Sequence, residues 1–147
     1  MPEFGRVMGL DVGDVRTGIA LSDPMQLIAS PRTVLAVKDE ATDIAAILKL
    51  AQEEEVTCIV AGVPLNQAGS HGPQAEKVLK FVEALRAATP LPVETIDERF
   101  STVSAQKSLI AAGARRDKRK QVIDKVAAAQ ILQLYLDRAA AQRRAAH

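Results

Sequence analysis

Residues 6–23, RVMGLDVGDVRTGIALSD, decide the fold. The stretch begins as an apolar strand on which Val7, Gly9 and Asp11 share one face, because alternate side chains of a strand point to opposite sides. A glycine-containing turn follows, and residues 17–21 then read as the second strand of an antiparallel hairpin. Asp11 therefore occupies a position where a hydrophobic side chain is expected.

A carboxylate at this position needs a partner, since the burial of an unpaired charge costs free energy. One explanation is that Asp11 only accepts hydrogen bonds from the amides of its own turn. The other is that it pairs with a cationic side chain or binds a cation. This stretch alone leaves both explanations open.

The rest of the chain switches between strand and helix patterns. Residues 25–38 read as a third strand interrupted at Pro31, and residues 39–55 as a helix with Asp39 as its N-cap. The apolar run at 56–63, VTCIVAGV, is typical of a strand buried on both faces. The remaining expected elements are a helix from Pro73, a strand at 93–97, a helix from about residue 101 to Ala112, and a last helix from about Gln121 into the 140s.

This order predicts one α/β domain over residues 1–147, with residues 139–147 as a frayed, Ala/Arg-rich tail. The first three strands are expected to be antiparallel. The later strands, reached through helical crossovers, are expected to run parallel to the first. The prediction is a mixed central sheet with helices on both faces.

The composition limits the functions that the chain can have. The formal net charge is +1, so any attraction for nucleic acid must come from local clusters of basic residues. Three Phe, one Tyr and no Trp argue against a binder that stacks rows of bases. A single cysteine, Cys58, fits a reducing cytoplasm and is expected to be a small buried hydrophobe. No apolar run approaches the ~20 residues of a membrane span, and the N-terminus lacks a signal peptide's pattern.

Acidic residues recur where expected elements begin or end. Asp97 and Glu98 lie at the end of the last strand. Because successive side chains of a strand alternate, the two cannot point to the same face of the sheet. Asp124 lies near the start of the last helix and shares a helix face with Ala128, four residues on. Small alanines there allow a close approach to the sheet, although an acid in a first helical turn also simply complements the helix dipole.

If that helix face looks at the sheet, Asp11, Glu98 and Asp124 come together. Three carboxylates in one place repel one another unless cations hold them. Mg²⁺ or Mn²⁺ suits such a set, because both ions take carboxylate and water oxygens. Two such ions can activate a water and stabilise a leaving oxygen in phosphodiester hydrolysis.

A basic run, RRDKRK at 115–120, precedes the Asp124 turn. Such runs are often only solvated loops. Next to a carboxylate–metal site, the run would also neutralise phosphates that flank the cut. The candidate phosphate-binding residues in the run are Arg115, Arg116, Lys118, Arg119 and Lys120.

Taken together, these residues resemble the YqgF/RuvX family of Holliday-junction-resolvase-like nucleases, also described as pre-16S rRNA nucleases. The resemblance covers nearly the whole chain. Its motifs are GLDVG at 9–13 with Arg16, Gly18, Ala20, Ser22 and Asp23; GVPLN at 62–66 with Gly69 and Ser70; DER at 97–99 with Ser101, Thr102 and Ala105; and Lys120, Asp124, Ala127, Ala128, Ile131, Leu132, Tyr135 and Leu136.

The resemblance implies an RNase H-like fold with Asp11, Glu98 and Asp124 as catalytic residues and metal ligands. By the same resemblance Glu98 is the ligand, and Asp97 is a secondary candidate. Arg16 and Arg99 are implied as phosphate contacts or partners of the acids, although a salt bridge between Arg99 and Asp97 explains Arg99 equally well. His71 is a further candidate for substrate contact, with a plain loop histidine as the alternative.

The implied function is a two-metal endonuclease acting on structured nucleic acid, either in 5′-end processing of pre-16S rRNA during ribosome biogenesis or in the resolution of branched DNA. The sequence does not separate these substrates, because such a site acts on the phosphate and not on the base. A resolvase needs two symmetric cuts and hence a homodimer. Two other classes are an ATP-binding fold of the sugar-kinase and actin type, which needs two such domains, and a non-catalytic nucleic-acid-binding or transcription-associated module.

Overall fold

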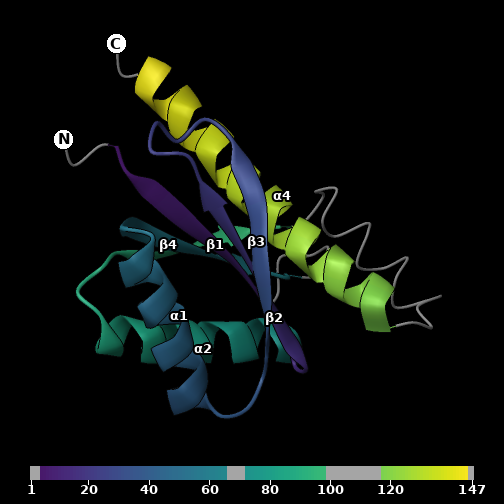
Figure 1. Cartoon of the computed structure of the whole chain (residues 1–147). Helices are drawn as coiled ribbons and strands as arrows, with labels where there is room; N and C mark the ends of the chain where they lie inside the picture. The colour runs from purple at the N-terminus through teal and green to yellow at the C-terminus, as the bar shows by residue number, and fades with distance from the viewer. Residues whose placement is uncertain (1–3, 66–71, 99–116, 146–147) are drawn as a thin grey trace.

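A five-stranded sheet lies at the centre of the computed structural model, which describes residues 4–65, 72–98 and 117–145, and only the backbone of residues 117–125. Figure 1 shows that helices cover both faces of the sheet. Within these residues the elements are β1 (Arg6–Val12), β2 (Arg16–Ser22), β3 (Ala29–Ala36), α1 (Glu40–Glu53), β4 (Val56–Val63), α2 (Pro73–Ala88), β5 (Val93–Asp97) and α4 (Asp117–Ala145).

The sheet is mixed, as the sequence predicts. Its strand order is β3-β2-β1-β4-β5. β1 pairs antiparallel with β2 and parallel with β4, while β2–β3 is antiparallel and β4–β5 parallel. β1 is therefore the central strand, and a residue near its end is covered by neighbours on both sides.

The helix starts on the α1/α2 face follow the local signals in the sequence. The Asp39 carboxylate accepts a hydrogen bond from the Thr42 amide at 2.8 Å, which makes it the N-cap of α1. Pro73 is the first residue of α2. Its missing N–H costs nothing there, because the first N–H groups of a helix have no partner within the helix.

The third strand is shorter than expected. Residues 25–28 form a turn instead, because the Asp23 carboxylate accepts hydrogen bonds from the amides of Met25, Leu27 and Ile28 at 2.7–3.0 Å. These bonds, that of Ile28 most strongly, lower the pKa of Asp23. The pairing register of β2 and β3 also shifts close to Pro31, as a proline without an N–H requires.

The last helix begins earlier than expected, at Asp117 instead of about Gln121. Residues 118–120 of the basic run therefore lie in its first turn and not in a loop. An acidic residue at a helix start and good helix formers such as Lys and Arg behind it favour this earlier beginning. The helix expected from residue 101 to Ala112 lies outside the described residues. No helix in the described part is long and apolar enough to cross a membrane.

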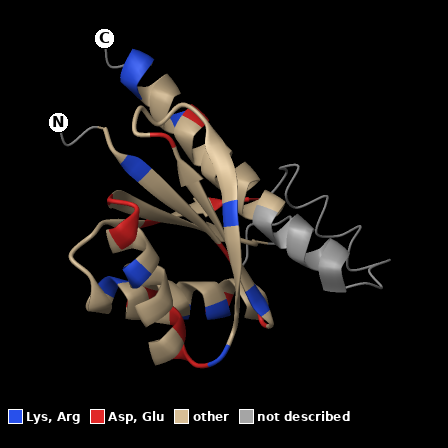
Figure 2. Ribbon diagram, in the orientation of Figure 1, with Lys and Arg blue, Asp and Glu red and all other residues tan. Residues whose placement is uncertain are grey.

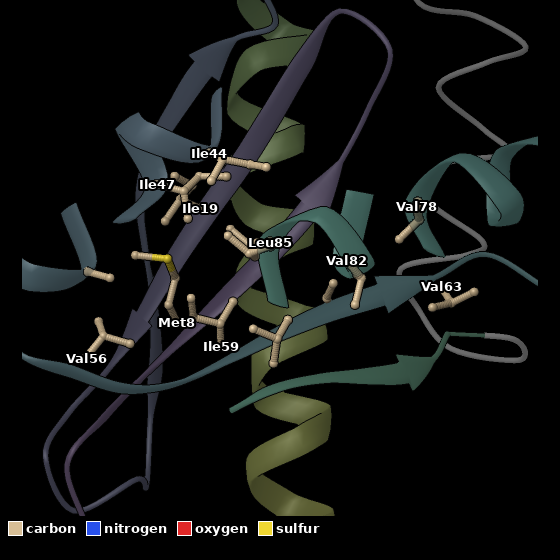
Figure 3. Close-up of a cluster of buried hydrophobic side chains, with 14 of the residues drawn as sticks. Met8, Ile19, Ile44, Ile47, Val56, Ile59, Val63, Val78, Val82 and Leu85 are labelled. Carbon is tan, nitrogen blue, oxygen red and sulfur yellow. The ribbon is translucent and has the colours of Figure 1, made fainter. Parts of the chain in front are cut away.

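Two hydrophobic cores cover the two faces of the sheet. Figure 3 shows the core between the sheet and helices α1 and α2, where Met8, Ile19 and Ile59 from the strands meet Ile47 and Leu85 from the helices. The second core lies under α4. Its buried members are Val7, Ala20, Val60, Ile96, Ala127, Ala128, Ile131, Leu132 and Leu136.

α4 approaches the sheet very closely at Gly9. A Cβ atom at this position would lie 2.7 Å from Cβ of Leu132 and 3.0 Å from the carbonyl oxygen of Ala128. Only glycine leaves room for the helix there. The small side chains of Ala127 and Ala128, both buried, extend the same close contact along the helix.

Farther along, a polar cluster ties α4 to the edge strand β5. The Tyr135 hydroxyl donates to Oε2 of Glu94 at 2.7 Å, and the Cys58 thiol donates to the same oxygen at 3.4 Å. Burial, with Glu94 adding to it, raises the pKa of the Cys58 thiol to about 12. Burial, again with Glu94, also raises the pKa of Tyr135. Both groups are thus neutral donors at physiological pH. Cys58 is only partly buried and bonds a carboxylate, so it is not simply the buried hydrophobe that the sequence suggests.

We expect Gly9→Ala to lower the free energy of unfolding by about 1–3 kcal/mol, because the added methyl overpacks against Leu132 and the helix backbone. Urea denaturation measures this. The control is Gly72→Ser, at a helix N-cap with open space around its Cβ position, which should leave stability unchanged or slightly raise it. Equal stability of Gly9→Ala and the parent would contradict the close contact.

We expect Glu94→Gln to speed the alkylation of Cys58 by iodoacetamide at pH 8. Removal of the carboxylate lowers the thiol pKa, and only the thiolate reacts. The control is Glu76→Gln, an exposed acid on α2 far from the cluster in sequence and on the other face. An unchanged rate in Glu94→Gln would mean that burial alone sets the thiol pKa.

Candidate active site

Asp11 is the penultimate residue of the central strand and is buried, with 6% of its surface exposed. It shares its strand face with Val7 and Gly9, which pack against α4. The carboxylate therefore belongs to the α4 side of the sheet, on the face that alternation along the strand predicts.

Glu98 directly follows β5 and is almost fully buried, with 1% exposed. Its backbone N–H donates to the carbonyl of Val63 at 3.3 Å, which holds it beside the end of β4. A Cβ atom at Gly62 would lie 2.5 Å from Oε2 of Glu98 and 2.7 Å from Cδ1 of Ile131 on α4. The Glu98 carboxylate thus lies over Gly62, on the same side of the sheet as α4.

The strand register makes Asp11 and Glu98 neighbours. Leu10 is level with Ala61, so the next residues along these parallel strands, Asp11 and Gly62, lie side by side, at a strand spacing of ~4.8 Å. Because the Glu98 carboxylate covers Gly62, it lies next to the position of Asp11. Two buried acidic residues from separate segments therefore lie side by side on the α4 face of the sheet.

Asp97 belongs to the opposite face of the sheet. Along β5, Val93 packs in the core under α1 and α2, while Ile96 packs in the core under α4. Alternation then places Asp97 with Val93 and Glu98 with Ile96. The geometry favours Glu98 over Asp97 as the partner of Asp11, in agreement with the resemblance.

Asp124 lies in the described backbone of α4, but its side chain falls outside the description. α4 runs antiparallel to β1, as Figure 1 shows. Leu132 lies over Gly9, and the Gln133 side chain accepts a hydrogen bond from the backbone N–H of Ala29 at the start of β3. The N-terminal part of α4 therefore lies toward the end of β1 that carries Asp11. Position 124 lies on that portion of the helix, one turn before the buried Ala128.

Arg16 lies close to Asp11 across the hairpin. Asp11 pairs with Gly18, and Arg16 is two residues from Gly18 on the same face of β2. The other expected contacts, His71, Arg99, Arg115 and Arg116, lie outside the described residues, as do the side chains of Lys118, Arg119 and Lys120. No three His, Cys, Asp or Glu of the described part gather as metal ligands do; the third expected acid, Asp124, is not among them.

Sequence reasoning did not assign roles to Gly62 or to the Glu94 cluster. The signal for Gly62 was present, because a glycine inside an apolar strand often marks the close approach of another group. The contact of Glu94 with Cys58 and Tyr135 joins three distant segments that carry no local pattern. Gly62 matters to the site because any larger residue would occupy the space of the Glu98 carboxylate.

Comparisons with known sequences agree over almost the whole chain. Residues 5–138 match the family model RuvX, described as Holliday junction resolvase. A protein of Clostridioides difficile (strain 630) is 48% identical over 133 residues, which span 90% of this chain and 94% of the relative. A protein of Natranaerobius thermophilus is 41% identical over the same shares. Both relatives carry the name "Putative pre-16S rRNA nuclease".

Solved structures with a similar fold share little sequence with this chain. RuvC of T. thermophilus in complex with a Holliday junction substrate aligns with a TM-score of 0.56 at 14% identity, covering 92% of this chain and 96% of that one. The fowlpox virus resolvase in complex with Holliday junction DNA aligns with a TM-score of 0.55 at 9% identity, covering 91% and 98%. The fold is thus RNase H-like, and from the family model and the curated relatives this chain belongs to the RuvX family.

Proposed function

We propose that this protein is a metal-dependent endonuclease that hydrolyses phosphodiester bonds in structured nucleic acid, with Asp11, Glu98 and Asp124 as its catalytic carboxylates. The observation that carries the proposal is the meeting of Asp11 and Glu98, both buried, under α4. Membership of a family whose model is described as a resolvase, together with relatives named as nucleases, supports the same reaction class.

The chemistry of the two described carboxylates fits a hard divalent cation. Like charges that share a buried site disfavour each other's ionised form unless a cation offsets them. The oxygen ligands of Asp11 and Glu98 suit Mg²⁺ or Mn²⁺, and Asp124 would supply the third carboxylate. A bound ion of this kind would supply an activated water and stabilise the leaving oxygen.

The protein's own part in the reaction is to hold the carboxylates in place. Gly62 leaves the space in which the Glu98 carboxylate lies, and the Val63 carbonyl fixes the Glu98 backbone. Residues held by packing and by backbone bonds keep ligand geometry better than residues on open loops. His71 remains a secondary candidate for contact with substrate, whereas Asp97, the secondary candidate for the acidic site, lies on the other face of the sheet.

Phosphate contacts are proposed to come from Arg16, Arg99 and the basic run. Figure 2 shows the Lys and Arg residues of the described ribbon scattered among Asp and Glu. The run at 115–120 is the densest group of basic residues in the sequence. The run ends in the first turn of α4. The N-terminal part of this helix lies toward the end of β1 that carries Asp11.

We propose precursor 16S rRNA, trimmed at its 5′ end, as the substrate, and the cytoplasm, where ribosomes are made, as the place of action. Names of the curated relatives favour this substrate. The alternative is a four-way DNA junction, the ligand of the RuvC structure that shares the fold. A junction resolvase would act as a homodimer, because it must make two symmetric cuts. A non-catalytic binding module is the remaining candidate.

The deciding experiment incubates the purified protein with Mg²⁺, Mn²⁺ or EDTA on a pre-16S rRNA fragment and, in parallel, on a four-way DNA junction. Cleavage of the RNA alone, with metal alone, is the expected result. Cleavage of the junction by a dimer would support the resolvase alternative. Tight binding without cleavage of either substrate would support the non-catalytic module.

We expect Asp11→Asn and Asp124→Asn each to lower the cleavage rate by about a hundredfold or more, because each removes a charge that stabilises the reacting groups. Substrate affinity, measured by fluorescence anisotropy, should stay the same or rise, since the substitution takes a negative charge away from the phosphates. The matched control is Asp14→Asn, an exposed acid in the turn after β1 that pairs with Lys77. Parent-like cleavage by Asp124→Asn would remove that residue from the site.

Replacement of Arg115, Arg116, Lys118, Arg119 and Lys120 by Gln should have the opposite effect. Affinity should fall, and the slope of log affinity against log salt should flatten by roughly 0.7–0.9 for each phosphate that the variant no longer neutralises. Cleavage should persist when substrate is supplied at high concentration. An unchanged salt slope would mean that the run is only a solvated segment.

A further inference from the structure

A hollow of about 230 Å³ lies on the β2–β3 part of the sheet. Its described walls are Val15, Arg16, Val34 and Ala36. Small-molecule sites usually measure ~300–1,000 Å³, so this hollow suits a single flat ring and not a whole cofactor. A site for phosphate alone would be lined by several polar or basic groups. This hollow has one basic side chain and three aliphatic ones, so it suits a ligand with an apolar part as well.

The strand register places the hollow beside the carboxylates. Asp11 pairs with Gly18, and Gly18 pairs with Val34, so these three residues form one row across the sheet. Arg16 and Ala36 pair in the next row of the same face. At two strand spacings, Val34 lies ~10 Å from Asp11, with the side-chain-free Gly18 between them.

Apolar exposure around the hollow has no explanation in the fold. Val15 is 59% exposed and Val37 is 37% exposed, and the Val37 amide donates to the Val15 carbonyl at 2.8 Å. The other exposed large hydrophobic residues of the described chain are Phe4, Met25, Leu27 and Ile28, at or near the ends of strands away from Asp11. The apolar rim and the hollow therefore coincide next to the candidate active site.

We propose that the hollow takes one unpaired nucleobase of the strand that is cut, stacked on the Arg16 guanidinium and lying against Val34 and Ala36. This proposal rests on the proposed nuclease function, and it requires that the substrate carry an unpaired base near the cut. Arg16 lines the hollow and has contacts of its own. A guanidinium bonds polar partners in its plane and stacks through its face, so it can hold a polar partner and a base at the same time. Of the four side chains, only Arg16 carries a hydrogen-bonding group, so the hollow accepts any base.

The proposal makes substrate choice a matter of nucleic-acid structure. A base can enter the hollow only after it leaves its stack, which costs least where it is already unpaired. The hollow thus selects single-stranded ends, bulges and junction branch points over continuous duplex. Because it reads neither the sugar nor the base edge, it serves RNA and DNA alike.

The test measures binding in EDTA, by fluorescence anisotropy, to two probes: a DNA duplex with one unpaired 2-aminopurine and the same duplex fully paired. The variants are Ala36→Leu, which fills the hollow without a change of charge, and Arg16→Lys, which keeps the charge but loses the flat face. The matched control is Ala45→Leu, the same exposed change on α1 on the other face of the sheet.

We expect the parent and Ala45→Leu to bind the bulged duplex about fivefold more tightly than the paired one, and 2-aminopurine fluorescence to rise on binding. Ala36→Leu should lose this preference and the rise while keeping the parent's affinity for paired duplex. Arg16→Lys, at a proposed phosphate contact, should also lose the preference and the rise, even if its affinity for both probes falls. Equal affinity of the parent for both probes, no rise in fluorescence, or an equal loss on both probes in Ala36→Leu would overturn the proposal. Because no metal is present, failure of the nuclease function appears separately, as absent cleavage by the parent in the assay with Mg²⁺ or Mn²⁺.

Discussion

The contact of α4 with the backbone of β1 at Gly9 is the constraint on which the candidate site depends. Without a side chain at Gly9, the helix lies directly on the sheet, with Leu132 and Ala128 against the strand. The same face of the same strand carries Asp11 two residues later. The close contact of the helix turns a strand-end aspartate into a buried one, 6% exposed. Burial strengthens each electrostatic interaction of that carboxylate, which is what chemistry on a phosphate needs.

The α4 face carries acids at both ends, and the fold treats them differently. Glu94 meets two neutral donors, the hydroxyl of Tyr135 and the thiol of Cys58, so its charge fastens the helix to the edge strand. At the other end Glu98 and Asp11 lie side by side as buried acidic residues. The first end contributes stability; the second buries two acidic residues, at a cost in desolvation, where the proposed function places the catalytic carboxylates. Active sites commonly take on such a cost to stability in return for function.

Local patterns predicted the parts of the fold that local forces determine. Alternation along the first strand identified the face of Asp11, and alternation along the fifth separated Glu98 from Asp97. The N-cap at Asp39 and the proline at the start of α2 followed from backbone chemistry within one turn. These features need no knowledge of which segments meet.

What the sequence left out depends on contacts between distant segments. The turn at Asp23 replaced the expected start of the third strand because three amides converge on one carboxylate. Gly62 gained its role only once Glu98 and Ile131 arrived above it from other elements. Such convergence leaves at most a hint in a single sequence, here a glycine within an apolar strand.

A protein of net charge +1 can still act on a polyanion, because screening restricts electrostatics to short range. At physiological ionic strength the Debye length is about 8 Å, so charges on the far faces contribute little at the site. In the proposed function the relevant balance is local: two buried carboxylates, which repel phosphate, against Arg16 across the hairpin and the basic run ahead of Asp124. Weak long-range attraction does not distinguish one nucleic acid from another, so the proposed function needs short-range contacts to select the substrate. For the proposed substrates such contacts have an advantage, because continuous duplex, the commonest competitor, offers mainly its phosphates.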